Sequence, residues 1–496
     1  MPINIIGTAL IEGTDKIPGW KYIRALTPPL ITATIIKLYF SGSSNTWERD
    51  LHSKVYIITG GTSGIGAALA RELGNRGAQL VLLTSQIDAE GNGNSWITDY
   101  VNDLREATGN ELIYAEHCDL ASLYSVRKFA TKWLDAKPAR RLDGVLCLAS
   151  ECMPLGKARE TSVDGVERQM AINYLAHYHL LTLLQPALKV QPPGRDVRVL
   201  LSTCLSQSMA SIDLSDLLWD ERRYPVRSPW TVYGTSKMML NMFGKEFQRR
   251  LDKSRGKDSG PNTLRVNIVN PGIVRTPSTR RAISMGTIWG LLLYLILYPI
   301  FWLFFKSAEQ GMQSFVYGVC NPDLIDLQGG KYIKECTVMQ SESRAELNDE
   351  ELQGKVFELT KVLIQKLEKE SAIERNKGKS RKEREKSKKE KAKESEKKDN
   401  NAHSVFETAF KNSSADLFPD MGNLRKTGGN VDKAREQLLK DLDAKFDASH
   451  KKKGTPTATT ASASPATTTT TSTTTTSSSP KVATPKPKSK SKSKKV

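Results

Sequence analysis

A tyrosine and a lysine stand four positions apart in the segment YGTSK, as Tyr233 and Lys237. On a helix these two side chains share a face and lie one turn apart. A tyrosine hydroxyl has an ordinary pKa of about 10, too high for ready proton exchange at neutral pH, and a nearby ammonium group lowers it by favouring the phenolate. The pair could therefore serve in general acid–base chemistry. The spacing alone also fits a solvated pair on a helix surface, so its weight depends on the segments around it.

A second segment, VYIITGGTSGIG, has the composition of a phosphate-binding turn. A β-branched run at Val55–Thr59 leads into Gly60, Gly64 and Gly66, and a helical stretch follows. Glycines allow a tight turn and close approach of the backbone to a ligand, and the N-terminus of a helix offers free N–H groups and partial positive charge to a pyrophosphate. An ordinary glycine-rich turn would contain the same residues, but the position between a strand and a helix predicts a dinucleotide site.

The end of the next strand indicates which dinucleotide is bound. It reads LVLLTSQ and carries no acidic residue to hold the ribose 2′-hydroxyl of NAD. It carries no arginine either, but Thr84 and Ser85 could bond a 2′-phosphate. The sequence therefore favours NADP over NAD.

The order of elements predicts the fold class. Between Ser53 and about Cys336, helical stretches separate six runs with the composition of strands: KVYIIT, QLVLLT, ELIYAEHC, DGVLCLA, VRVLL and LRVNIV. Strands that alternate with helices indicate βαβ units, and near-continuous apolar strands fit a sheet covered on both faces. We expect an α/β fold with a doubly wound, mostly parallel sheet, followed by a helical and disordered C-terminal extension.

Composition divides the chain into four parts. We expect a membrane-contacting preamble at 1–52, one globular domain at 53–340, a charged helical segment at 341–398, and a mostly disordered tail rich in Ser, Thr and Lys, with one short helix, at 399–496.

The extension after the globular domain is strongly basic and begins with a helical pattern. Residues 1–350 carry a net charge of +4 and residues 351–496 carry +15, so the basic character says little about the site. Apolar residues at helical spacing predict an amphipathic helix at the start of the extension: Leu352, Val356, Leu359, Leu363 and Leu367.

Taken in chain order, these segments resemble the short-chain dehydrogenase/reductase family, in its classical, retinol-dehydrogenase-like branch. The resemblance covers roughly Ser53–Cys336 and implies a Rossmann-type sheet. It places Asp119 of CDL at the adenine and Thr276 of NPGIVRT at the nicotinamide carboxamide. The cofactor-binding residues it implies are Gly60, Thr62, Ser63, Gly64, Ile65, Gly66, Ser85, Asp119, Leu120, Asn173, Tyr233, Lys237, Pro271, Gly272, Val274 and Thr276.

The resemblance also implies a catalytic set. Tyr233 would carry the proton, Lys237 would lower its pKa and grip the ribose, and Asn173 in AINYLAHYHLLTLL would hold a water that refills the proton. The family often has a Ser-Ser pair whose second member acts, but this chain has Ser202-Thr203, so either hydroxyl could polarise the substrate oxygen.

A second departure from the family lies in the loop CLAS, Cys147 to Ser150, which stands where the family has Asn-Asn-Ala-Gly. This cofactor-side loop is therefore expected to be arranged differently. The implied reaction is hydride transfer between nicotinamide and a carbonyl or secondary alcohol.

An uncharged run, TIWGLLLYLILYPIFWLFF at Thr287–Phe305, interrupts the domain. Its 19 residues would reach about 28 Å as a helix, close to a bilayer core. By the resemblance it is the substrate loop, and the last strand after it must return to the sheet, so both ends must lie on one side of a membrane. Pro299 would turn a re-entrant hairpin or bend an interfacial helix. A buried core or dimer helix is the alternative, but seven aromatic residues favour monotopic attachment.

These features predict an enzyme for a lipophilic substrate such as a lipid, a sterol or a retinoid-like alcohol, on the cytosolic face of the endoplasmic reticulum membrane or of a lipid droplet. The alternative is a catalytically weak membrane scaffold that keeps the fold and acts through its basic tail. Six scattered cysteines form no C-x-x-C, which indicates a reducing compartment and no metal site. No nucleic-acid partner is expected, and the sequence leaves a homodimer open.

Overall fold

The computed structural model describes residues 20–87, 95–192, 195–254, 263–340, 342 and 344–377, with the single positions 393 and 440. The chain forms two units, Met1–Lys388 and Lys389–Val496. The tail predicted for 399–496 lies, apart from one position, outside the described residues.

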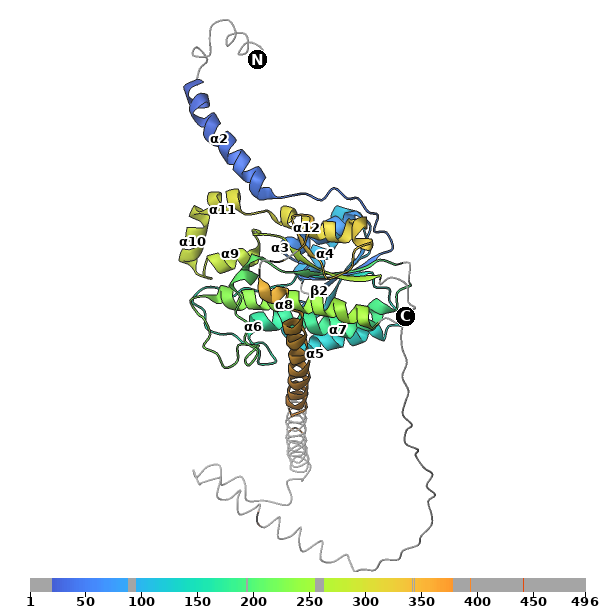
Figure 1. Ribbon diagram of the computed structural model, residues 1–496. Helices are drawn as coiled ribbons and strands as arrows, with labels where there is room; N and C mark the ends of the chain where they lie inside the picture. The colour runs from blue at the N-terminus through green and yellow to red at the C-terminus, as the bar shows by residue number, and fades with distance from the viewer. Residues whose placement is uncertain are drawn as a thin grey trace, which may run out of the picture. The chain divides into compact units, whose positions relative to one another are not determined.

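An eight-stranded sheet forms the centre of the first unit, in the order β3-β2-β1-β4-β5-β6-β7-β8. Figure 1 shows the sheet among its helices. Its strands are β1 (Val55–Thr59), β2 (Gln79–Thr84), β3 (Ile113–His117), β4 (Gly144–Cys147), β5 (Val197–Ser202), β6 (Leu264–Asn270), β7 (Tyr332–Lys334) and β8 (Thr337–Met339). Neighbours from β3 to β7 run parallel, and β8 pairs with β7 in the antiparallel direction. The predicted fold class is confirmed, and the six predicted strand runs coincide with β1 to β6.

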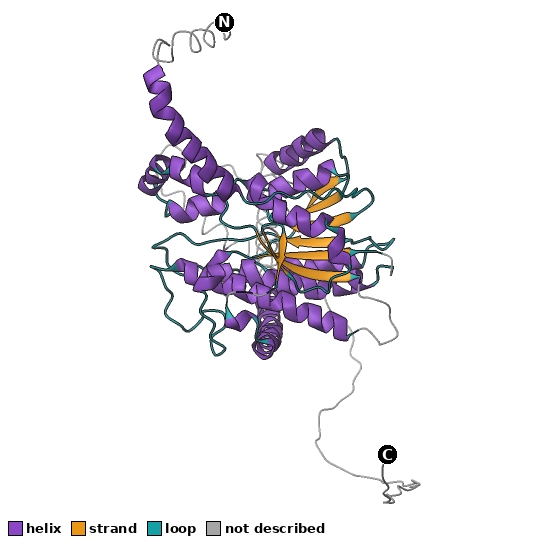
Figure 2. Cartoon of the chain, turned by 45° about the horizontal axis from the view of Figure 1, so that its top comes forward, coloured by secondary structure: helices purple, strands orange, loops and turns teal. Residues whose placement is uncertain are grey.

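Helices cover both faces of the sheet, as Figure 2 shows. One layer contains α3 (Gly64–Asn75), α4 (Ser95–Thr108) and α12 (Ala308–Cys320), and the other contains α5 (Leu123–Leu134), α7 (Ala176–Lys189) and α8 (Pro229–Lys253). Alternate residues of each strand enter different layers. In β5, Val199 and Leu201 join the core under α7 and α8, whereas Leu200 packs toward α12.

A further helix over 350–377 packs on α7 and α8. Val356, Phe357 and Ile364 are buried there, and the Phe357 ring stacks 5.8 Å from that of Phe243. Four of the five predicted apolar positions contact this core, but Leu359 is 38% exposed, because the buried stripe passes through Phe357 and Ile364 instead.

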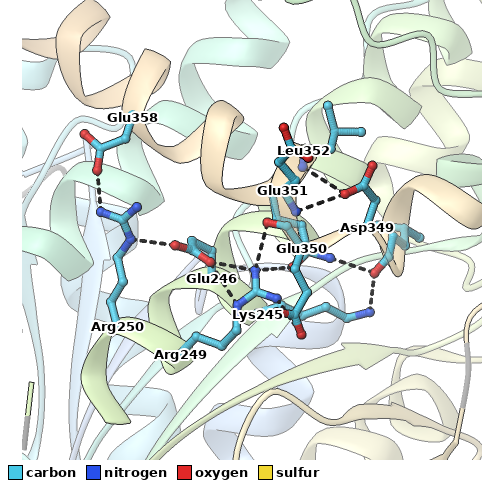
Figure 3. Close-up of polar contacts among 11 residues, drawn as sticks. Lys245, Glu246, Arg249, Arg250, Asp349, Glu350, Glu351, Leu352 and Glu358 are labelled. Carbon is cyan, nitrogen blue, oxygen red and sulfur yellow. Dashed lines mark hydrogen bonds and ion pairs between the residues drawn. The ribbon is translucent and has the colours of Figure 1, made fainter. Parts of the chain in front are cut away.

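Ion pairs flank this apolar contact (Figure 3). Arg250 on α8 contacts Glu358 at 2.5 Å, and Arg249 contacts Glu350 at 3.2 Å. The first turns of the charged segment are therefore part of the folded domain rather than a free extension.

The apolar run inside the domain forms two short helices, α10 (Ile288–Ile296) and α11 (Tyr298–Phe304), which follow α9 (Pro277–Ile283). The helical conformation is interrupted between them at Leu297, two residues before Pro299. Lys306 then pairs with Val274, so the two ends of the insertion meet at the sheet edge. Of the helices in the described part of the chain, none is both long and apolar enough to cross a membrane.

The preamble contributes a 22-residue helix, α2 (Trp20–Ser41), which includes Pro28 and Pro29. Its C-terminal end contacts α11: the Phe40 and Phe304 rings meet edge to face at 5.1 Å, and Lys37 Nζ donates to the Phe305 carbonyl at 3.0 Å. Two segments that are far apart in the sequence thus form one apolar surface.

Candidate active site

Tyr233 and Lys237 lie one turn apart on α8, as the spacing predicts. Lys237 is 1% exposed, and its Nζ donates to the Ser202 carbonyl at 3.1 Å and lies 5.8 Å from the centroid of the Tyr233 ring. The side chains of Ser150 and Cys204 lie close to the Tyr233 hydroxyl. The carboxyl end of β5, the loop after β4 and helix α8 therefore meet at this hydroxyl.

Burial sets the proton affinities of the pair. It raises the pKa of Tyr233 well above its ordinary value, and the nearby Cys204 thiol raises it further. It lowers the pKa of Lys237 to about 8, against an opposing effect of the Cys204, Cys147 and Cys152 thiols. The pKa of Tyr233 moves in the opposite direction to the one expected from an ammonium neighbour alone, because the cost of removing the phenolate from water exceeds the stabilisation that nearby groups provide.

Asn173 lies in a π-helical turn, Ala171–Leu175, between α6 (Arg168–Met170) and α7. Its side chain is fully engaged: Oδ1 accepts from the Glu151 N–H at 2.7 Å, and Nδ2 donates to the Glu151 carbonyl at 2.9 Å and to Ser236 Oγ at 3.0 Å. Such turns displace the residues of a helix from regular spacing. Asn173 thus fixes the loop after β4 against α8, next to Tyr233.

Thr59, at the carboxyl end of β1, holds the CLAS loop in place. Thr59 Oγ1 accepts from the backbone N–H of Leu148 and of Ala149, each at 3.1 Å, and contacts His177 Nε2 at 3.0 Å. The loop therefore closes against the end of β1 without the family's asparagines, and it presents Ser150 to Tyr233.

The glycine turn is built for close backbone approach. Gly60 has a φ of +69°, and a Cβ there would lie 2.8 Å from the Ala149 Cα. A Cβ at Gly66 would lie 2.1 Å from the Gly60 carbonyl oxygen, so any side chain would open the turn. Ser63, which precedes α3, makes no side-chain capping bond, so this helix N-terminus has the character of an anion site.

The remaining predicted cofactor residues lie along the same carboxyl edge of the sheet. Ser85 follows β2 and is exposed, whereas Asp119 and Leu120 follow β3 and are half-buried, and the Asp119 carboxylate accepts from the Ala121 N–H. After β6, the chain turns at Pro271 and Gly272 and passes the buried Val274. It then reaches Thr276, which caps α9 and whose side chain lies where a Cβ on Gly64 would meet it. Thr62 and Ile65 are half-buried beside the glycines.

The two predicted hydroxyls are less accessible than their neighbour. Thr203 is 1% exposed, and its Oγ1 donates to Gln207 Oε1 at 2.9 Å. Ser202 is 8% exposed, and strand alternation puts its side chain on the Leu200 face, away from α8. Cys204 is half-buried and contacts Ser206 Oγ at 2.6 Å. Sequence reasoning missed Cys204 and Ser150 as neighbours of Tyr233, although both lie in segments where this chain departs from the family pattern.

Comparison with known proteins agrees with this arrangement. A family profile described as short chain dehydrogenase matches residues 54–209. An oxidoreductase of Saccharomyces cerevisiae, described as uncharacterized, is 43% identical over 399 residues, which cover 77% of this chain and 96% of that protein. The chain belongs to the short-chain dehydrogenase family. Retinol dehydrogenase 13 of Homo sapiens is 30% identical over 66% of this chain and 88% of its own length, and polyprenol dehydrogenase of Mus musculus is 32% identical over 61% and 82%.

This short-chain dehydrogenase falls in the retinol-dehydrogenase-like branch, and it is an NAD(P)-dependent oxidoreductase. The glycine turn fits the cofactor, because its backbone leaves the space that a Cβ would fill and the adjoining helix N-terminus favours a pyrophosphate. When bound, the nicotinamide supplies or accepts the hydride.

Proposed function

We propose that this protein is an NADP-dependent oxidoreductase for the carbonyl or secondary alcohol of a hydrophobic substrate, such as a lipid, a sterol or a retinoid-like molecule, at a membrane surface. One observation carries the proposal: an exposed apolar surface, formed by α2, α10 and α11, is connected to the loop beside Tyr233 through α9, where Arg281 pairs with Glu151.

The exposed side chains are large and numerous. Ile288 and Trp289 at the start of α10 are 86% and 81% exposed. Other exposed residues of this surface are Leu26, Leu30, Ile35, Leu38, Tyr39, Leu292, Leu295, Ile296, Ile300 and Trp302. Apolar patches of this kind mark lipid or partner contacts, and burial of five such side chains is worth on the order of 10 kcal/mol before ordering costs.

Cationic and aromatic groups accompany this surface. Lys37 Nζ lies 5.4 Å from the Trp302 ring centroid, and Arg275 donates to the Tyr298 hydroxyl at 2.9 Å. Amphipathic aromatic residues beside lysine and arginine are typical of protein segments at a membrane–water interface. They support a monotopic contact rather than a purely apolar docking site.

The apolar surface and the active site are linked through Glu151. Its carboxylate pairs with Arg281 on α9 at 2.7 Å, while its backbone is held by Asn173. A substrate that leaves a bilayer along α10 would therefore arrive beside the loop that carries Ser150. The names of the relatives, which specify retinol and polyprenol, support a lipophilic alcohol or aldehyde.

The choice of NADP is supported by the end of β2, where Thr84 and the exposed Ser85 stand and no acid follows within TSQ. We expect NADPH to bind more tightly than NADH in a fluorescence titration. Ser85→Asp should weaken NADPH selectively, because it places a carboxylate beside the 2′-phosphate. Tighter binding of NADH by the unaltered protein would contradict this choice.

Each residue of the set has a role in the proposed chemistry. Tyr233 gives its proton to the substrate oxygen during reduction and takes it back during oxidation, while Lys237 holds the ribose and favours the phenolate. Asn173 holds the loop after β4 against α8, and in this proposal it also holds a water that returns a proton to Tyr233. The family pattern assigns the polarising of the substrate oxygen to Ser202 or Thr203.

A pair of substitutions tests the proposed chemistry. Tyr233→Phe should abolish NADPH-dependent reduction of retinal in detergent micelles and keep cofactor affinity, because it removes only the proton carrier. Lys237→Ala should lose both, since it also removes the ribose contact. Normal turnover by Tyr233→Phe would refute the catalytic assignment.

The proposed location is the endoplasmic reticulum membrane or a lipid droplet, with the catalytic domain in the cytosol. The two ends of the insertion meet at Val274 and Lys306, so both should lie on one side. Protease sites inserted before Arg280 and after Lys306 should both be cut from the cytosolic side of intact microsomes. Protection of one site alone would mean that the segment spans the membrane.

A further inference from the structure

The structure favours a different residue beside the Tyr233 hydroxyl from the two that the sequence suggested, Ser202 and Thr203. A group that polarises the substrate oxygen must lie within hydrogen-bond reach of the space beside this hydroxyl and must be accessible to the substrate. Thr203 fails the second requirement, because it is buried, and its hydroxyl is already committed to Gln207.

The Thr203 hydroxyl belongs to a closed polar network on the α8 side of the sheet. Gln207 Oε1 also accepts from Asn241 Nδ2 at 3.2 Å, and Asn241 donates to Glu342 at 2.6 Å. Lys245 pairs with the same carboxylate at 2.7 Å. Release of this hydroxyl toward a substrate would leave buried polar groups unsatisfied, which is costly.

Ser202 is engaged differently. Its backbone carbonyl accepts from Lys237, and it is the last residue of β5, paired with Val269 of β6. Strand alternation directs its side chain to the face where Leu200 packs against α12. Its contribution to the site is therefore a carbonyl oxygen that positions Lys237.

Cys204 lies on the correct side. The turn Leu205–Met209 rests on α8 beside Tyr233, and a Cβ at Gly234 would lie 2.1 Å from the Ser206 carbonyl oxygen, so glycine next to Tyr233 permits this approach. The Cys204 side chain lies beside the Tyr233 hydroxyl, and both residues are half-buried rather than closed off.

We propose that Cys204 is a catalytic residue that donates a hydrogen bond from its thiol to the substrate oxygen opposite Tyr233, with Ser206 orienting the thiol. The inference rests on the proposed oxidoreductase function and extends it. Ser206 Oγ lies 2.6 Å from Cys204 Sγ, so its hydroxyl can donate to the sulfur and direct the S–H outward.

The sulfur of Cys204 is neither oxidised nor reduced in the proposed reaction. During reduction, the carbonyl carbon receives the hydride of the reduced cofactor, the oxygen takes the Tyr233 proton, and the C=O double bond becomes a C–OH group. The thiol keeps its proton throughout and only stabilises the charge that develops on the oxygen. A thiol is a weaker donor than a hydroxyl, and sulfur is larger than oxygen, so this site should accept a serine without loss.

Three variants in a Cys336→Ser background test the assignment. All six cysteines are described, and Cys204 and Cys336 are the two that are not buried, so this background leaves one accessible thiol. With retinal as probe, Cys204→Ala should lower kcat about ten- to a hundred-fold, at or below the effect of losing an oxyanion-hole donor, with unchanged NADPH affinity. Cys204→Ser should restore or exceed the parent kcat, which a purely structural role would not require. Tyr233→Phe should be inactive.

A second measurement does not depend on turnover. N-ethylmaleimide should alkylate Cys204 in the Cys336→Ser protein, and NADPH with retinal should slow the reaction about ten-fold or more, read by mass spectrometry, since both would occlude a thiol at the reacting oxygen. The inference is overturned if NADPH and retinal give no protection, if Cys204→Ala keeps kcat within about two-fold, or if Ser202→Ala or Thr203→Val loses as much as it does. Failure of the proposed function would look different, because Tyr233→Phe would then remain active.

Discussion

Phe357→Ala is the most direct test of whether the charged extension belongs to the folded domain. The Phe357 ring lies 5.0 Å from Tyr178 and 5.8 Å from Phe243, and the Arg250 guanidinium covers it at 4.0 Å. Truncation of a buried phenylalanine costs about 3–5 kcal/mol, through lost transfer energy and a cavity that the surroundings fill only in part. Domains are stable by about 5–15 kcal/mol, so this one change should remove a large share.

The assay is urea unfolding followed by circular dichroism, with Leu359→Ala as the matched control. Leu359 lies two residues away on the same helix but is 38% exposed, so its truncation should change the free energy of unfolding by no more than about 0.5 kcal/mol. Deletion of 350–377 should cost more than Phe357→Ala, because it also uncovers the surface on which Val356 and Ile364 rest and removes the ion pairs of Glu350 and Glu358 (Figure 3). Equal, small effects of the two alanine variants would refute the packing of this helix on α7 and α8.

Three further predictions concern other parts of the chain. Burial lowers the pKa of His177 to about 4, below its ordinary 6.5, so the unfolded chain takes up a proton at a higher pH than the folded protein does, and the free energy of unfolding should fall as the pH drops from 6.5 toward 4. Chemical denaturation across that window should show a loss of roughly 3 kcal/mol that His177→Gln abolishes, and the same pH dependence in the variant would contradict this prediction. Removal of residues 400–496 should leave stability and NADPH affinity unchanged in the same assays, because this tail is poor in apolar residues; a loss of cofactor affinity would show that the tail contacts the domain. Replacement of Thr287–Phe305 by a short polar linker should weaken flotation with phospholipid vesicles and leave NADPH binding intact, since the glycine turn, Asp119 and Tyr233 all precede it; unchanged flotation would remove α10 and α11 from the membrane contact.

The parts of the fold that the sequence predicted correctly are those fixed by local pattern. The strands β1, β2, β4, β5 and β6 are short, mainly apolar runs buried on both faces, whereas β3 is only partly buried. Gly60 and Gly66 mark a turn that leaves no room for a side chain. The helix over 350–377 was also visible as an apolar stripe. Its partner was not, because nothing in that stripe indicates that α7 and α8 expose the aromatic groups it covers.

The choice among Ser202, Thr203 and Cys204 depended on tertiary structure for a similar reason. Alternation along β5 separates Ser202 from Thr203, but the sequence cannot say which face carries α8, and it does not place Cys204, which follows the end of the strand. Gln207, Asn241 and Glu342, which come from separate segments, occupy the Thr203 hydroxyl and so decide the matter. The π-helical turn at Asn173 was equally hidden, since its purpose is a contact with Glu151 on another loop.

The cofactor half of this enzyme and the insertion that we propose contacts the substrate are built by different means. The first includes the turn after β1, where a Cβ added at Gly60 or Gly66 would collide with neighbouring backbone. The second is an insertion closed at Val274 and Lys306 and buttressed by α2 through Phe40 and Phe304, so its outward face can be apolar without disturbing the sheet. Because Glu151 joins the two halves through Arg281, a displacement of the insertion in a bilayer would be transmitted to the loop beside Tyr233. The proposed membrane contact would then change the turnover of every substrate, including water-soluble ones, through the Arg281–Glu151 ion pair that holds this loop.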